Sequence, residues 1–276
     1  MAGALLGLAA FGLYALYDIT IKFFGGVLNP MQVLFCAGAF ALPLILGQLV
    51  LTGQARTLKP VLPRWTAARI AVTLLNGTLG AYAFSVLPLA EAYAVFFLMP
   101  LLISALAVPL LGEPMDMPRS AAIFAGLIGV VVALRPGEAE LGLGHLAALS
   151  AATMGALNYI IIRKTSGVEQ PGVILLYPTI ALVVATGMAM PWLWVPMTPG
   201  QVGLTFLMAV ELFLGGYAIV AAYRRAPAIV VAPMQYSQIF WAAVLGWLLF
   251  GEVIGLATAL GIAIIIASGM VLLARS

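Results

Sequence analysis

The chain reads VLPLAEAYAVFFLMPLLISALAVPLLGE from Val86 to Glu113 and YRRAPAIVVAPMQYSQIFWAAVLGWLLFGE from Tyr223 to Glu252. Both stretches hold apolar runs of the roughly 20 residues that an α-helix needs to cross the hydrocarbon layer of a bilayer. Both also end in a Gly-Glu dipeptide, whose glycine is expected to cap the helix. They predict two related membrane-spanning segments, one in each half of the chain.

The two halves of the chain align at a shift of about 140 residues. The aligned pairs are Pro88 with Pro227 and Gly112-Glu113 with Gly251-Glu252 at a shift of 139, and Gly3 with Gly144 and Pro30 with Pro171 at a shift of 141. Internal repeats can decide a fold. We therefore expect two repeats of related structure, residues 1–138 and residues 139–276.

The composition is that of an integral membrane protein. Of 276 residues, 64% are hydrophobic and 8% are charged, against about 25% charged residues in soluble domains. A single cysteine, Cys36, and a single histidine, His145, exclude a disulfide framework and leave too few ligands for a zinc, haem or iron–sulfur site. The 12 basic residues form no block, which argues against nucleic acid as a partner. We expect neither a cofactor nor a metal.

Ten apolar runs are expected to be transmembrane helices, because a backbone inside lipid must satisfy its own hydrogen bonds. They lie at residues 3–23, 30–52, 66–87, 88–111, 119–135, 144–163, 171–191, 200–222, 227–250 and 254–274. The first run has no basic region before it and no cleavage site after it, so we expect a retained helix.

Basic residues predict the orientation, since Lys and Arg near helix ends are retained on the cytoplasmic side. One set of alternate loops holds Arg56, Lys59, Arg64, Arg69, Arg119, Arg163, Lys164, Arg224, Arg225 and Arg275. The other set holds only Lys22 and Arg135. We therefore expect a multi-pass protein of the bacterial inner membrane with both termini in the cytoplasm.

Five helices in each repeat fix how the repeats are related. Because five is odd, the second repeat must cross the membrane in the opposite sense to the first. Many secondary transporters use such inverted repeats to build alternating access around a site near the bilayer midplane. The expected fold class is an all-α integral membrane protein, with ten transmembrane helices in two inverted five-helix repeats around a central cavity.

The stretches 86–113 and 223–252 resemble the paired EamA domains of the drug/metabolite transporter (DMT) superfamily, with the YddG-type amino-acid exporters as the closest group. The resemblance covers essentially the whole chain. It implies ten helices, two inverted repeats, a central cavity and export of amino acids or other small metabolites. It also implies that the helices at 119–135 and 254–274 lie outside the cavity that the other eight surround.

Glu211 lies near the middle of the predicted helix at 200–222, and we expect its carboxyl group well inside the hydrocarbon layer. Burial in an apolar layer favours the neutral form of a carboxyl group. Glu211 is therefore a candidate proton carrier, or a site for a substrate ammonium. A protonated Glu211 that donates a hydrogen bond to a neighbouring helix fits the sequence equally well.

Polar side chains within the spans are candidates for the cavity wall. Gln235 and Gln238 are three residues apart, so their amides share a face and could bind the carboxylate and ammonium of a zwitterion. Hydrogen bonds between helices, worth about 0.6–2 kcal/mol, are the alternative. The predicted substrate-binding residues are Asn76, Thr78, Tyr82, Asn158, Glu211, Tyr217, Gln235, Tyr236, Gln238 and Trp241.

Charged residues within the other spans are few. Asp18 and Lys22 are four residues apart and are expected to pair on one helical face. So few cations within the spans argue against strongly anionic cargo such as sugar nucleotides, which need Lys or Arg in the cavity.

These residues favour a secondary transporter. The sequence has no phosphate-binding loop, so gradients must supply any energy, and proton-coupled and uncoupled modes both remain open. The prediction is export of small metabolites, chiefly amino acids including aromatic or hydrophobic ones, by alternating access. A transporter of multidrug or cationic compounds, or of nucleotide-derived metabolites, is the alternative. An enzyme would need a nucleophile with its base, or a metal, at membrane depth, and a channel is a third reading.

Overall fold

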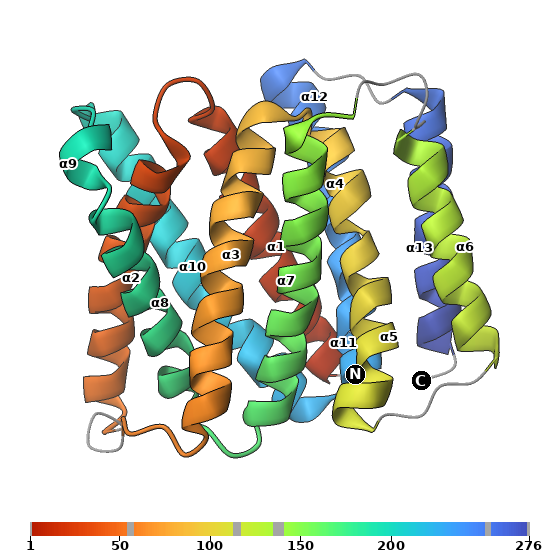
Figure 1. Cartoon of the computed structure of the whole chain (residues 1–276), viewed down its shortest axis with the longest axis horizontal. Helices are drawn as coiled ribbons and strands as arrows, with labels where there is room; N and C mark the ends of the chain where they lie inside the picture. Colours follow the sequence, from red (N-terminus) through yellow and green to blue (C-terminus); the bar gives the residue numbers. More distant parts are fainter. Residues whose placement is uncertain (1, 54–57, 113–116, 135–140, 252–254, 275–276) are drawn as a thin grey trace.

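Helices cover the predicted apolar runs, and two of these runs are interrupted (Figure 1). The structure, a computed structural model, describes residues 2–53, 58–112, 117–134, 141–251 and 255–274. The elements are α1 (Ala2–Phe23), α2 (Pro30–Leu51), α3 (Pro63–Val86), α4 (Leu89–Phe96), α5 (Leu98–Leu111), α6 (Met117–Leu134), α7 (Leu143–Thr165), α8 (Pro171–Gly187), α9 (Met190–Leu193), α10 (Pro199–Arg225), α11 (Ala228–Val231), the 3₁₀ helix η2 (Ala232–Tyr236), α12 (Ser237–Phe250) and α13 (Leu256–Ala274). In the part of the chain so described, every regular element is a helix.

Proline sets the start of four of the long helices. Pro30 and Pro171, which align in the predicted repeat, open α2 and α8. Pro63 and Pro199 open α3 and α10. The first turn of a helix suits proline, because a backbone N–H there would have no partner inside the helix.

The predicted helices at 88–111 and 227–250 are broken, and the expectation of two continuous helices is wrong. The first divides into α4 and α5 around Phe97, and the second into α11, η2 and α12. Pro100 and Pro233 follow or occupy these breaks, and each lacks the N–H that would donate to the carbonyl one turn earlier. Both breaks lie beside the cavity described below.

Glycine caps end the same two runs, as the Gly-Glu dipeptides predict. Gly112 follows α5 with φ 70° and Gly251 follows α12 with φ 65°, in the left-handed region that favours glycine. Glu113 and Glu252 lie outside the described residues.

Helices α1, α2, α7 and α10 are each long and apolar enough to cross a membrane. Shorter apolar helices include α5, α8 and segments within α6 and α13. A bundle of such helices is that of a multi-pass integral membrane protein.

Helices from the two halves pack against one another. Helix α1 packs along α10, and α3 packs along α7. Helix α2 packs on α8, and α6 packs on α13 as a pair at one side of the bundle (Figure 1). The core thus depends on contacts between segments far apart in the sequence.

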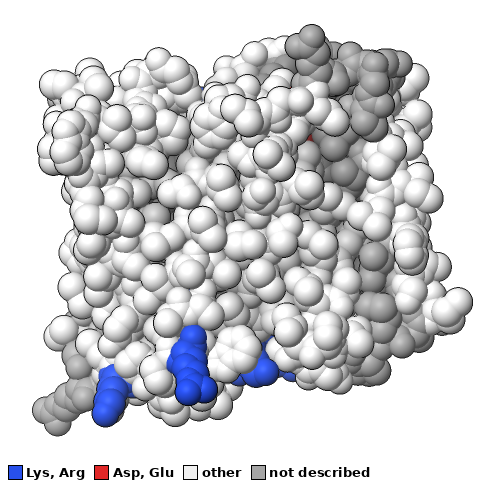
Figure 2. All heavy atoms as spheres, viewed as in Figure 1, with Lys and Arg blue, Asp and Glu red and all other residues white. Residues whose placement is uncertain are grey.

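Both chain ends lie at the same end of the bundle (Figure 1). In the same view, the Lys and Arg side chains that are visible gather along that edge (Figure 2). There Arg163 donates to the carbonyl of Tyr223 at 3.0 Å, and Lys164 donates to that of Leu110 at 3.3 Å. Cations at helix C-termini satisfy carbonyls that have no partner within their own helix.

Candidate functional site

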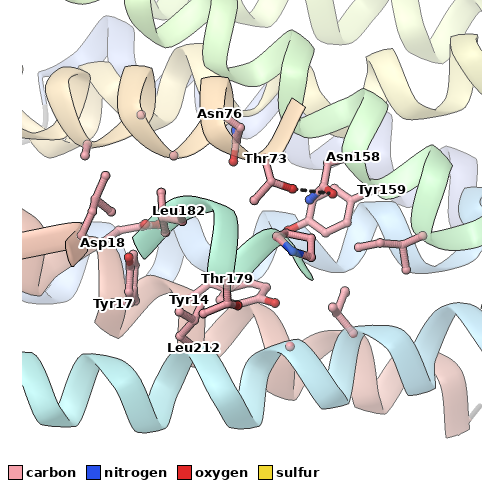
Figure 3. A pocket seen from close by; sticks show the side chains of 18 of the residues that line it. Tyr14, Tyr17, Asp18, Thr73, Asn76, Asn158, Tyr159, Thr179, Leu182 and Leu212 are labelled. Carbon is pink, nitrogen blue, oxygen red and sulfur yellow. Dashed lines mark hydrogen bonds between the residues drawn. The ribbon is translucent and has the colours of Figure 1, made fainter. Parts of the chain in front are cut away.

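A cavity of about 220 Å³ lies inside the bundle (Figure 3). Its lining residues come from α1, α2, α3, α4, α5, α7, α8, α10, η2 and α12, which are the eight predicted spans that the resemblance places around a cavity. Among the described residues, neither α6 nor α13 contributes to the lining. The wall is mostly apolar, with a limited set of polar groups.

Polar side chains reach the cavity from several helices (Figure 3). They are Tyr14, Tyr17, Asp18, Arg69, Thr73, Asn76, Asn158, Tyr159, Thr179, Gln235 and Gln238. Thr73 donates to the amide oxygen of Asn158 at 3.2 Å, and Asn76 donates to the carbonyl of Ala151 at 2.8 Å. The wall on this side is therefore also a hydrogen-bonded seam between α3 and α7.

Of the predicted substrate-binding residues, the structure brings Asn76, Asn158, Gln235 and Gln238 together in the cavity wall. Gln235 lies in η2 and Gln238 in the first turn of α12, because the helix that carries them is interrupted. Both amides are buried. Their roles in binding stay predictions.

The other predicted residues lie elsewhere. Thr78 donates to the carbonyl of Leu74 in its own helix at 2.7 Å, and the side chain of Tyr82 is exposed, with no part in the cavity lining. Tyr217 donates to the side chain of Gln48 at 2.5 Å. Tyr236 packs its ring on Phe97, and the side chain of Trp241 is outside the described part of the chain.

Glu211 is buried in α10, as the sequence predicts, but it does not line the cavity. Its Oε2 atom has no hydrogen-bond partner in the described structure. The carboxyl group lies within electrostatic range of Tyr17, whose ring is part of the wall. The carboxyl group of Glu211 is therefore separated from the cavity by one wall residue, Tyr17.

Arg69 is the main residue that sequence reasoning missed. The positive-inside count treats it as an interfacial anchor, but its side chain is only 7% exposed and lines the cavity. One of the few cations within the predicted spans thus lies in the cavity wall. Its position in the second turn of α3, beyond Pro63, places it inside the span and could have revealed it.

Asp18 also lines the cavity. Its carboxylate accepts a hydrogen bond from the side-chain amide of Gln238 at 3.3 Å. Lys22, its expected partner, donates to the carbonyl of Leu87 at 3.0 Å and lies 5.4 Å from the centre of the Phe250 ring. The acid thus lines the cavity, whereas the lysine contacts the end of α3 and the last residue of α12.

Residues 142–274 match the EamA-like transporter family. The match spans α7 to α13, so the similarity to this family lies in the second half of the chain.

Several curated relatives align with most of this chain. An S-adenosylmethionine uptake transporter of Rickettsia bellii is 26% identical, over 90% of this chain and 85% of its own. A riboflavin transporter of Vibrio cholerae is 26% identical, over 83% and 78%. A pseudopaline exporter of Pseudomonas aeruginosa is 24% identical, over 91% and 89%. The chain is therefore related to membrane transporters that carry different small molecules.

A solved crystal structure shares the fold. It aligns over 99% of this chain and 97% of its own with a TM-score of 0.77 and 19% sequence identity.

Proposed function

We propose that this chain is an EamA-like secondary transporter that exports small metabolites, amino acids among them, across the inner membrane by alternating access. The observation that carries the proposal is the cavity inside the bundle, whose wall combines aromatic rings with a few convergent polar groups. The EamA-like domain and the relatives named as transporters support membrane transport. That the cargo includes amino acids, and that it is exported, is proposed in addition to membrane transport.

The size of the cavity supports a small cargo. Pockets that bury drug-sized ligands hold roughly 300–1,000 Å³. The cavity here holds about 220 Å³, which suits a molecule of amino-acid size in this conformation.

The proposed architecture is two inverted repeats, residues 1–138 and 139–276. In the proposed repeat, α1 is equivalent to α7 and α3 is equivalent to α10. Exchanging equivalent helices therefore turns the contact of α1 with α10 into the contact of α7 with α3. The pairs α2 with α8 and α6 with α13 map onto themselves. Such a pattern supports a two-fold relation between the halves, around which two rigid bundles could rock.

The proposed orientation places both termini in the cytoplasm. The cluster of basic residues at the end of the bundle that holds the termini supports it, because the cytoplasmic side retains Lys and Arg. The end that carries Lys22 then faces the outside.

Counterflow in proteoliposomes tests the proposed function. Vesicles loaded with one unlabelled solute would be offered labelled amino acids, with and without a pH gradient. We expect saturable, competed uptake for at least one amino acid. Uptake that never saturates would indicate a pore, and counterflow confined to non-amino-acid solutes would remove the amino-acid assignment.

A nucleotide-derived cargo is the second candidate. It rests on the relatives named for S-adenosylmethionine and riboflavin. Labelled S-adenosylmethionine and riboflavin belong in the same assay, where stronger counterflow of either than of every amino acid would favour this candidate.

The mutation Glu211→Gln should alter transport or its dependence on pH. A carboxyl group that changes protonation in the cycle cannot be replaced by an amide of the same shape, whereas a permanently neutral one can. The measurement is counterflow rate against pH for the wild type and the variant. Superimposable pH profiles with equal rates would exclude a role for Glu211 in coupling.

A further inference from the structure

Arg69 carries a buried charge that no carboxylate in the described part of the chain neutralises. Its side chain is 7% exposed, and Nε and Nη1 both lack hydrogen-bond partners in the described structure. An arginine keeps its charge in a protein, and a buried cation without a counter-ion is strongly unfavourable. A group that stabilises it must therefore come from outside the described residues or from the cavity's ligand.

The groups around Arg69 indicate that its guanidinium faces the central cavity. The hydroxyls of Tyr14 and Tyr159 lie within electrostatic range of the guanidinium, and both rings line the cavity. Glu169 shares a second void of only about 10 Å³ with Arg69, but no ion pair joins the two. One Oε1 of Glu169 instead accepts from the backbone N–H of Leu62 at 2.6 Å. The larger open space beside Arg69 is thus the central cavity.

Asp18 and Gln238 form an acceptor-rich group elsewhere in the same wall. The Gln238 amide nitrogen points to Asp18, at 3.3 Å from the carboxylate, which fixes the orientation of the amide. Its oxygen, Oε1, is buried without a partner, and so is Oε1 of Gln235. A carboxylate and unpartnered amide oxygens accept hydrogen bonds from a cation such as an ammonium.

The donor and acceptor groups lie toward opposite ends of the cavity. Helices α1 and α3 both start at the end of the bundle that holds the termini (Figure 1). Arg69 lies in the second turn of α3, whereas Asp18 lies close to the far end of α1. Figure 3 shows Asp18 and Tyr159 at opposite sides of the cavity, with Tyr14 and Thr73 between them.

We infer that the cavity is a two-pole site for a zwitterion, in which Arg69 binds a carboxylate and Asp18 with Gln238 binds the cationic group. Among the described lining residues, Arg69 is the sole cation and Asp18 the sole carboxylate, so a cargo with one charge of each sign complements both charges of the wall. A phosphate dianion would bring one negative charge too many. The inference rests on the proposed function and names its substrate class.

The test compares an amino acid with analogues that lack one charge. L-phenylalanine, its methyl ester and N-acetyl-L-phenylalanine would each compete against a labelled substrate in counterflow. That labelled substrate, the best-transported amino acid or S-adenosylmethionine, carries both a carboxylate and a cationic group. We expect the wild type to prefer phenylalanine over the ester by about tenfold or more, the effect of one charged hydrogen-bonded pair. Arg69→Gln should bring that ratio close to one. Asp18→Asn should instead reduce the preference over the N-acetyl compound.

Arg64→Gln is the matched control. Arg64 is exposed in the first turn of the same helix, so its loss removes the same charge at the same end of the bundle without touching the cavity. The preference for phenylalanine over its methyl ester, called the ester ratio below, should stay at the wild-type value. If Arg69→Gln does not fold by size-exclusion chromatography, Arg69→Lys decides, because it keeps the charge but loses the paired geometry and should lower the ratio severalfold.

The outcomes separate the inference from the proposed function. Saturable transport with an unchanged ester ratio in the Arg69 variants, or a wild type that accepts ester and amino acid equally, overturns the two-pole site and leaves the transporter intact. A wild type that shows no saturable counterflow with any solute overturns the proposed function itself.

Discussion

Replacing Gly77 with phenylalanine should strongly slow saturable counterflow and leave the protein folded. Gly77 lines the cavity, and a Cβ atom there would meet only Leu182 Cδ1, at 3.8 Å. The new ring can therefore enter without a clash at its first atom, and it would fill a large share of the 220 Å³. Because the cargo must occupy this space, we expect the maximal rate to fall at least about tenfold.

Gly47→Phe is the control for this substitution. Gly47 lies in α2, where an added Cβ would meet nothing within 4 Å, and it does not line the cavity. Its variant should transport like the wild type. A Gly77→Phe protein that elutes as the wild type and still shows wild-type kinetics would mean that the cargo passes elsewhere.

Valine at Gly3 or Gly144, which align in the predicted repeat, should destabilise the fold. A Cβ at Gly3 would lie 2.7 Å from Ala226 Cβ and 3.2 Å from the Ala222 carbonyl, and one at Gly144 would lie 2.9 Å from Leu87 Cδ2. Overpacking of this kind costs about 1–3 kcal/mol, and the backbone at Gly3 cannot move aside as a side chain can. We expect a fall in Tm of about 2–10 °C in detergent.

The corresponding control is Gly203→Val in α10, where an added Cβ would have nothing within 4 Å. It should melt within about a degree of the wild type. If Gly3→Val and Gly144→Val also melt there, the close helix contacts that pair the two halves do not hold the protein together.

The positions of the helices could be predicted because they depend on apolar length and on proline, which both act locally. Pro30 and Pro171 open their helices as aligned, and Gly112 and Gly251 cap theirs. The breaks near Phe97 and at η2 could not be predicted from the sequence. A proline inside a membrane helix produces either a kink or a break, depending on which groups of the neighbouring helices bind the freed backbone carbonyls.

The cavity residues could be predicted only in part. A polar residue within an apolar run is recognised by its depth in the membrane, but the sequence does not show which way its side chain points. The depth of Asn76 and Gln238 in their spans predicts a place in the cavity wall, and both line the cavity. Thr78 lies at a similar depth but binds its own helix, and Tyr82 points outward. Arg69 shows the reverse error, since its place near a helix end suggests an anchor although its face of α3 turns inward.

The most direct test is whether one cavity residue can be reached from both sides of the membrane. In a Cys36→Ala background, Thr179→Cys in the cavity wall and Thr186→Cys, buried on the same helix but outside the lining, would meet an impermeant maleimide on either face of oriented vesicles. We predict labelling of the cysteine at 179 from both faces, changed in opposite directions by a transported solute, and none at 186. Labelling at 179 from one face only under every condition, or from neither, would contradict alternating access through this cavity.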